Sequence, residues 1–188
     1  NAGNNITLAG NATVVTSGAG TLTLTADADG DNVGAINAAA STTALQAGGG
    51  LVTLLAGSGI SAGTTIANVT ATNNGTGNIV ITDTAGGLTV AGAGISQIGA
   101  GTVSVTATNG TLAVNQNVTT SGNGTLTLTA TGGSSDVTVA AAKTVTSAGG
   151  NIAINADNDI TLTGTATVVT SGAGTLTLKA DAGTADGV

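Results

Sequence analysis

Acid–base or metal chemistry in this sequence depends on its aspartates, because the chain has no histidine, cysteine, tyrosine, tryptophan or glutamate. Three of them alternate in Asp27-Ala-Asp29-Gly-Asp31-Asn32, which resembles the start of an EF-hand calcium loop. The sequence departs from that loop at Asn32, where glycine is expected, and at Ala38, where a bidentate glutamate is expected. Calcium accepts flexible shells of carboxylate and carbonyl oxygens, so it is the cation these residues could hold.

A second acidic group follows two of the repeated strands described below. Asp157 and Asp181 are equivalent in neighbouring repeats, so we expect their carboxylates to lie about 4.8 Å apart. Like charges at that distance favour partial protonation or a bridging cation. We expect all nine aspartates on one edge of the molecule, the remainder being Asp83, Asp136 and Asp186; the candidate metal ligands are Asp27, Asp29, Asp31, Asp157, Asp159 and Asp181. The alternative is a solvated acidic edge that keeps the protein soluble.

Catalysis is not expected. Enzymes that cut polysaccharides on parallel β-helices need a general acid and base, cationic groups for substrate carboxylates and aromatic platforms for sugar rings. The chain has only two lysines as cations and no aromatic residue. A polysaccharide-active enzyme therefore remains only a remote alternative, and no cofactor is required.

The elements that must position these aspartates are short alternating strands. Gly20-Thr-Leu-Thr-Leu-Thr-Ala26 returns as Gly124–Ala130 and, with one change, as Gly174–Ala180. Apolar residues alternate with threonine, which is typical of a strand with one buried face. Aligning these and looser copies by their first inward residue gives Leu22, Val52, Ile79, Val103, Leu126, Ile152 and Leu176. A recurrence near 25 residues predicts a solenoid, in which each unit buries its face against its neighbours.

Two weaker strands follow in each unit, and glycine, serine, asparagine and aspartate separate them. We therefore predict an all-β fold, a three-faced parallel β-helix (β-solenoid) of about seven coils with roughly 25 residues each. The segments 31–45 and 57–74 are the least regular, so we expect bulges or protruding loops there. No segment has a helical period.

A longer repeat overlies the short one. Residues 5–28 match residues 159–182 at 20 of 24 positions, an offset of 154 residues. Residues 1–188 are thus interpreted as a single solenoid segment, slightly more than one six-coil repeat of a longer array. Open strand edges at its two ends would be covered by further coils or caps, since exposed edges promote aggregation.

The pattern N-x-I-T-L-x-G…T-V-V-T-S-G-A-G-T-L-T-L-x-A resembles the central repeats of filamentous-haemagglutinin-type adhesins and related very large bacterial surface proteins. This resemblance implies a right-handed β-helix, export through an outer-membrane partner pore, and a fibrous stalk at the extracellular bacterial surface. The expected partners are neighbouring repeats of the same chain, with lateral or end-to-end self-association and a host or cell-surface target that the sequence does not identify.

Charge and composition also bear on nucleic-acid, membrane, ice and glycan binding. The net charge of −7 argues against nucleic acid, which needs lysine and arginine to neutralise phosphates. No run of about 18 apolar residues predicts membrane insertion. Outward Thr-x-Thr pairs, such as Thr21 with Thr23, resemble ice-binding faces, although strand propensity alone favours threonine there. Seven Asn-x-Ser/Thr sequons could carry glycans or arise from composition alone: Asn5, Asn11, Asn68, Asn74, Asn109, Asn117 and Asn123.

Overall fold

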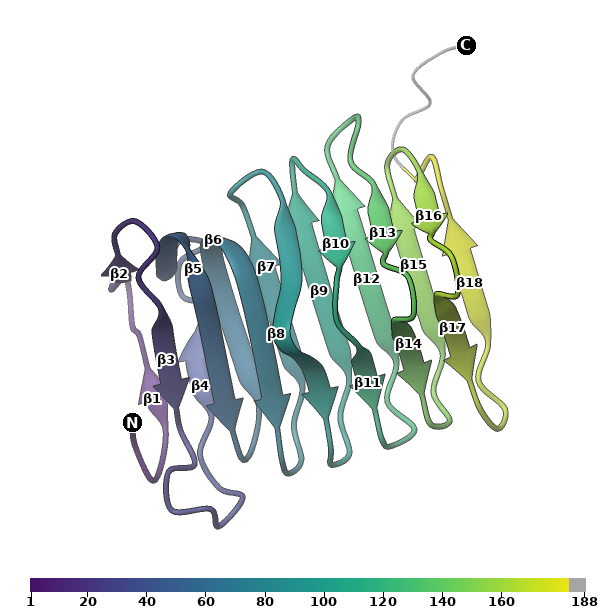
Figure 1. Ribbon diagram of the computed structural model, residues 1–188. Coiled ribbons are helices and arrows are strands. Elements are labelled where there is room, and N and C mark those ends of the chain that lie inside the picture. The colour runs from purple at the N-terminus through teal and green to yellow at the C-terminus, as the bar shows by residue number, and fades with distance from the viewer. Residues whose placement is uncertain (183–188) are drawn as a thin grey trace.

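A computed structural model describes residues 1–182, and within this range the protein contains strands and no helix. Every strand pair is parallel, and the strands stack along one axis from the N-terminal to the C-terminal end (Figure 1). The strands are β1 (Ile6–Thr7), β2 (Val14–Thr16), β3 (Leu22–Thr25), β4 (Ile36–Ala38), β5 (Leu45–Ala56), β6 (Ile60–Asn73), β7 (Ile79–Asp83), β8 (Leu88–Gln97), β9 (Val103–Thr108), β10 (Leu112–Val114), β11 (Val118–Thr120), β12 (Leu126–Thr131), β13 (Val137–Val139), β14 (Thr144–Ser147), β15 (Ile152–Ala156), β16 (Ile160–Leu162), β17 (Thr167–Thr170) and β18 (Leu176–Lys179). The predicted all-β parallel solenoid is therefore confirmed.

Paired strands place equivalent inward residues in continuous rows. The first row contains Ile6, Ile36, Ile60, Ile79, Val103, Leu126, Ile152 and Leu176. The second row contains Leu22, Val52, Val69, Val90, Val114, Val139 and Leu162. The third row contains Leu24, Leu54, Ala71, Ile95, Val118, Val145 and Val168. Each row is aliphatic throughout, so every coil buries its apolar side chains against the same kind of surface above and below.

The core is built from these rows and from parallel rows beside them, such as the row of Ile81, Val105, Leu128, Ile154 and Leu178. In β12, Leu126 and Leu128 are fully buried, while Thr127 between them and Thr129 after them are half-buried. Alanine closes the repeated strand where the chain turns, as at Ala107, Ala130 and Ala156, and these side chains are also fully buried. The predicted inward set is thus confirmed along most of the chain. Small side chains suit this narrow core, since no aromatic residue is present to fill a wider one.

The register differs from the predicted alignment in the N-terminal half. Leu22 pairs with Val52 as predicted, but Val52 pairs with Val69, and Ile79 pairs with Ile60. The segment 57–74, where bulges or protruding loops are expected, contains the strand β6, which pairs with β4 and β5 on one side and with β7 and β8 on the other; its register against β8 shifts between Val69 and Ala71. Because glycine, serine and threonine separate its buried residues, this strand lacks the Leu-Thr-Leu alternation that predicts the other strands.

Because of this inserted strand, the two copies of the long repeat occupy different rows. Ile6 lies in the first row, whereas its sequence equivalent Ile160 pairs with Val137 beside the second row. Leu22 lies in the second row, whereas its equivalent Leu176 lies in the first. The same sequence fits both places because the first, second and third rows are all aliphatic.

A column of glycines lets the coils approach at one turn. A Cβ at Gly101 would overlap the carbonyl oxygen of Gly77, and the same holds for each following glycine of the column against the one before it. The later members are Gly124, Gly150 and Gly174. At Gly124 and Gly174, glycine directly before Thr-Leu-Thr-Leu is therefore required by backbone packing between coils; at Gly20 an added Cβ would meet only its own turn, with the Ser17 carbonyl oxygen at 3.2 Å.

We predict that Leu128→Ala lowers the free energy of unfolding by about 2–5 kcal/mol, because it opens a cavity in a fully buried row. Leu178 holds the same position in the motif but is 46% exposed, so Leu178→Ala is the matched control and its cost is expected below about 1.5 kcal/mol. Urea unfolding followed by circular dichroism measures both. Equal losses for the two variants would contradict the row assignment.

Candidate functional site

The turn after β3 gathers three aspartates. Carboxylate oxygens of Asp27, Asp29 and Asp31 lie within 4.8 Å of one another. Asp27 Oδ1 accepts the Asn32 N–H at 3.0 Å, and Asp31 Oδ1 accepts the Val33 N–H at 2.8 Å. These bonds hold the turn closed around Asn32, whose φ is 62°. Asp27 Oδ2 is buried and has no hydrogen-bond partner among the described residues.

The second acidic group follows β15 and β18, which pair with the offset that makes Asp157 and Asp181 equivalent in neighbouring coils. Asp157 Oδ2 accepts the Gly132 N–H at 2.6 Å, and the Asp181 N–H donates to the Asn158 carbonyl at 3.1 Å. Within residues 1–182, Asp157, Asp159 and Asp181 do not form a cluster of three carboxylates with the spacing of the first group. Asp186 lies outside the described residues.

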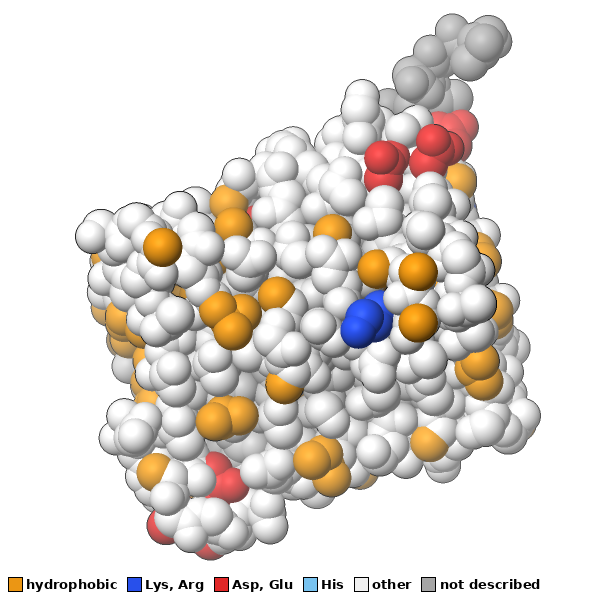
Figure 2. Space-filling view, viewed as in Figure 1, with side chains coloured by type: hydrophobic (Ala, Val, Ile, Leu, Met, Phe, Trp, Pro, Cys, Tyr) orange, Lys and Arg blue, Asp and Glu red, His pale blue; other side chains and the backbone are white. Residues whose placement is uncertain are grey.

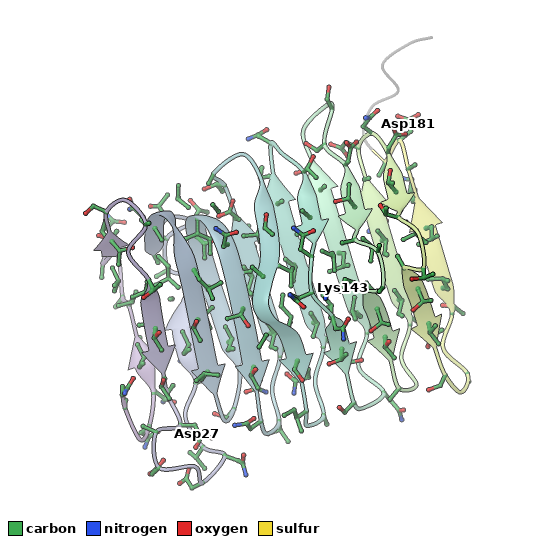
Figure 3. The ribbon with its side chains drawn as sticks, in the orientation of Figure 1. Asp27, Lys143 and Asp181 are labelled. Atoms are coloured by element: carbon green, nitrogen blue, oxygen red, sulfur yellow. The ribbon has the colours of Figure 1, made fainter. Side chains whose placement is uncertain are left out.

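The prediction of a single acidic edge is wrong. Asp27 and Asp181 lie near opposite ends of the solenoid and on opposite sides of it (Figure 3). Acidic side chains accordingly gather in two separate places on the surface (Figure 2). The cause is the register: Asp27 follows β3 in the second and third rows, whereas Asp181 follows β18, which pairs with β15 in the first row. The turns after β3 and β18 follow the same repeated sequence but therefore lie at different edges of the solenoid.

Asp83 is a buried carboxylate at the end of its strand, a position where the other copies of the repeated strand have alanine. Its side chain is fully buried at the end of β7. Oδ1 accepts the Thr64 hydroxyl at 2.8 Å and the Ile66 N–H at 2.9 Å, and Oδ2 accepts the Ala85 N–H at 2.9 Å. Burial raises the pKa of Asp83 above its usual value, and these three hydrogen bonds oppose that effect in part.

A buried amide pair lies at the end of β6 and β8. Asn73 Nδ2 donates to Gln97 Oε1 at 3.0 Å, and Asn73 Oδ1 accepts the Gly59 N–H at 2.7 Å. Gln97 Nε2 donates to the carbonyls of Gly75 and Gly99. Sequence reasoning missed this pair, because only the register brings the two residues together. All partners come from the chain itself, so the pair fixes the corner and leaves no group for a substrate.

Asparagine or aspartate directly before a strand links successive coils. Asn78 Oδ1 accepts the Thr102 N–H at 2.9 Å, and Asn151 Oδ1 accepts the Thr175 N–H at 2.9 Å. In each case the donor is the residue directly before the paired strand of the next coil. The other such bonds run from the N–H of Ala35 to Asn5, from that of Thr144 to Asn117 and from that of Asp159 to Asp136. We call these bonds Asx staples.

The outward threonines do not form continuous ranks. Thr23 pairs with Thr53, which pairs with Thr70, and the last of these is buried. On the first-row strands, Thr82, Thr106 and Thr129 are in register but continue into Asn155 and Lys179. The Thr21 and Thr23 pair therefore lies on a different set of strands from the pair at Thr125 and Thr127.

Six of the seven sequon asparagines are exposed, and Asn68 is half-buried with its Nδ2 donating to the Gly49 carbonyl at 3.0 Å. Asn5 and Asn117 use their Oδ1 atoms in Asx staples. The exposed sequons are Asn5, Asn11, Asn74, Asn109, Asn117 and Asn123. A glycan would thus have space at six positions.

A shallow groove of about 420 Å³ crosses the N-terminal coils. The paired outward residues Val15, Gln46 and Thr65 lie along it, and no aspartate or lysine lines it. Without a titratable group, this groove offers no general acid or base.

No helix in the described residues is long and apolar enough to cross a membrane. Comparison of the chain with known protein families, with curated proteins and with solved structures finds no match.

Asp83 gives the protein a specific pH dependence. The folded-state pKa of Asp83 is raised above its value in the unfolded chain. Its contribution to the free energy of unfolding is therefore fully present at pH values below the usual aspartate pKa, and it is lost as the pH rises through the folded-state pKa. We predict that the unfolding free energy of the wild type falls with rising pH over this window relative to that of Asp83→Asn. Chemical denaturation at several pH values measures this difference. Asp159→Asn, at an exposed position, is the control; a profile for Asp83→Asn parallel to the wild type would contradict the prediction.

Proposed function

We propose that this chain is a structural stalk segment of a large secreted bacterial adhesin or cell-surface filament, acting outside the cell and without catalysis. The observation that carries the proposal is the set of continuous aliphatic rows, which make each coil a repeat of its neighbour. The chain's resemblance to filamentous-haemagglutinin-type repeats supports the same reading, as does the absence of titratable groups from the groove.

We further propose seven three-faced, right-handed coils, each advancing about 4.8 Å, which gives a rod on the order of 35 Å. Such a rod holds other regions of its parent protein away from the cell. Its stiffness comes from coil-on-coil backbone hydrogen bonds and from the stacked rows. The exposed sequons are the positions at which we propose glycans.

A stalk tolerates the loss of a whole coil, since each coil contacts only its neighbours. Deleting residues 103–125 removes one whole coil and joins Thr102 to Leu126. Leu126 then takes the place of Val103 and pairs with Ile79. We predict that this variant keeps its β-sheet circular dichroism and that small-angle scattering shows a rod shorter by about 4.8 Å. Deleting residues 103–114, which removes only part of a coil, is the control and is expected to unfold. Unfolding of the whole-coil variant would contradict the spacer role.

A calcium-binding surface module is the second candidate. It is favoured by the Asp27, Asp29 and Asp31 cluster, in which Asp27 Oδ2 has no hydrogen-bond partner among the described residues. Three carboxylate oxygens this close are a partial calcium shell, which backbone carbonyls or water would complete.

If this cluster binds calcium, calcium raises the thermal midpoint of the wild type and chelation reverses the rise, because a ligand that binds only the folded state stabilises it. Asp29→Asn abolishes the rise, because it removes one of the three carboxylates of the cluster. The turn itself stays in place, since Asp29 is exposed and makes none of the turn's hydrogen bonds described above. Asp159→Asn, near the other end, leaves it intact. A midpoint that does not respond to calcium in the wild type would leave the cluster as a solvated turn.

A further inference from the structure

Asparagine followed directly by glycine is a sequence that can change covalently without an enzyme. It occurs three times, at Asn74-Gly75, Asn109-Gly110 and Asn123-Gly124. The backbone nitrogen of the glycine can attack the asparagine side chain, and glycine has no side chain that obstructs this attack. All three asparagines are exposed and lie outside the strands, at corners of the solenoid. The three pairs differ in how the surrounding structure holds them.

The Asn74 pair is held through the carbonyl of Gly75. This oxygen accepts Asn73 Nδ2 at 3.0 Å and Gln97 Nε2 at 3.0 Å. Both donors are fully buried, so they keep the carbonyl in a fixed position. Attack by the Gly75 nitrogen requires the peptide before it to rotate, and these two bonds resist that rotation.

The Asn123 pair is held in the same way. The carbonyl of Gly124 accepts the Thr120 hydroxyl at 3.3 Å and the Ser147 hydroxyl at 3.2 Å. Thr120 and Ser147 are buried, and Ser147 belongs to the following coil. Rotation at this pair would therefore break bonds within its own coil and to the next one.

The Asn109 pair lacks such an anchor. The Asn109 N–H donates to the Thr131 carbonyl at 2.6 Å, but within residues 1–182 neither the N–H nor the carbonyl of Gly110 makes a hydrogen bond. Asn109 has a φ of 62°, a left-handed conformation that asparagine adopts more readily than most residues. Close packing does not distinguish the pairs, since a Cβ on any of the three glycines would overlap a carbonyl oxygen of a neighbouring coil.

We propose that Asn109 is the site at which the folded chain deamidates. The Gly110 nitrogen loses its proton to a base in solution and bonds to Asn109 Cγ, while the bond from Cγ to Nδ2 breaks and ammonia leaves. The product is a cyclic imide. Water then opens the ring at either carbonyl, which gives aspartate or isoaspartate. Each event exchanges one amide for one carboxylate and needs no reactant other than water.

The product changes a crowded corner. A Cβ on Gly132, in the next coil, would lie only 2.7 Å from Asn109 Cα, so the isoaspartate, which adds a carbon to the main chain, has no room there. The new carboxylate also brings negative charge to the corner where Asp157 Oδ2 accepts the Gly132 N–H, and like charges repel. Deamidation is thus expected to loosen the contact between these coils.

Each of the three pairs is also an Asn-Gly-Thr sequon. A glycan would be attached to Nδ2, which is the atom that deamidation removes as ammonia. Glycosylation at Asn109 and deamidation there therefore exclude one another. The inference concerns the unglycosylated chain and does not depend on the proposed stalk function.

Mass spectrometry of the intact, unglycosylated protein in mildly alkaline buffer tests the inference. The folded wild type is expected to show, over time, the small mass gain that marks exchange of an amide for an acid. Asn109→Gly is expected to remove most of this gain, because glycine has no amide to lose and accepts a φ of 62°. Asn74→Gly and Asn123→Gly are the matched controls and are expected to leave the gain intact.

Urea-unfolded protein provides a second control, because the bonds to the carbonyls of Gly75 and Gly124 are then absent. In urea each of the three variants is expected to lose a comparable share of the mass gain. Circular dichroism in buffer checks that the variants are folded. A folded wild type that gains no mass while the unfolded wild type does would overturn the inference. So would a folded Asn74→Gly or Asn123→Gly variant that loses as much of the gain as Asn109→Gly.

Discussion

Parallel pairing between coils is the interaction on which the whole structure depends. Each interior strand donates hydrogen bonds to both neighbouring strands and accepts them from both, so its backbone is satisfied only when a coil is in place on either side. The rows of leucine, isoleucine and valine add apolar burial along the same direction. Stability is consequently a property of adjacent coils; within residues 1–182 β17 and β18 pair on one side only, and their apolar side chains are exposed there.

Several polar groups in the interior strengthen this pairing. Asp83, Asn73 and Gln97 are fully buried, and each makes hydrogen bonds to a neighbouring coil. The Asx staples do the same at the surface. Because uniform aliphatic rows would tolerate a slip of one coil along another, these directional bonds are well placed to fix the register. The chain thus uses its few distinctive side chains to define position between coils.

Sequence patterning predicted the all-β solenoid, the inward residues and the alanine at the end of the repeated strand. Alternation and period are local, and the core is too simple to override them. The register of the N-terminal half was not predictable from the same pattern, because β6 lacks Leu-Thr-Leu alternation and its insertion moves Leu22 and Val52 to different rows from Ile79. The proximity of Asp27, Asp29 and Asp31 followed from their spacing, whereas the expected single acidic edge failed with the register of the N-terminal half.

The row assignment is tested most directly by two double-cysteine variants in a chain that has no other cysteine. Ser61 and Val80 are paired outward neighbours, so Ser61→Cys with Val80→Cys is expected to form an intramolecular disulfide under mild oxidation. Thr53→Cys with Val80→Cys represents the register in which the repeated strands stack directly, and Thr53 instead pairs with Thr70. The structure predicts a disulfide in the first variant and free thiols in the second; the reverse result would contradict the inserted strand and the rows that follow from it.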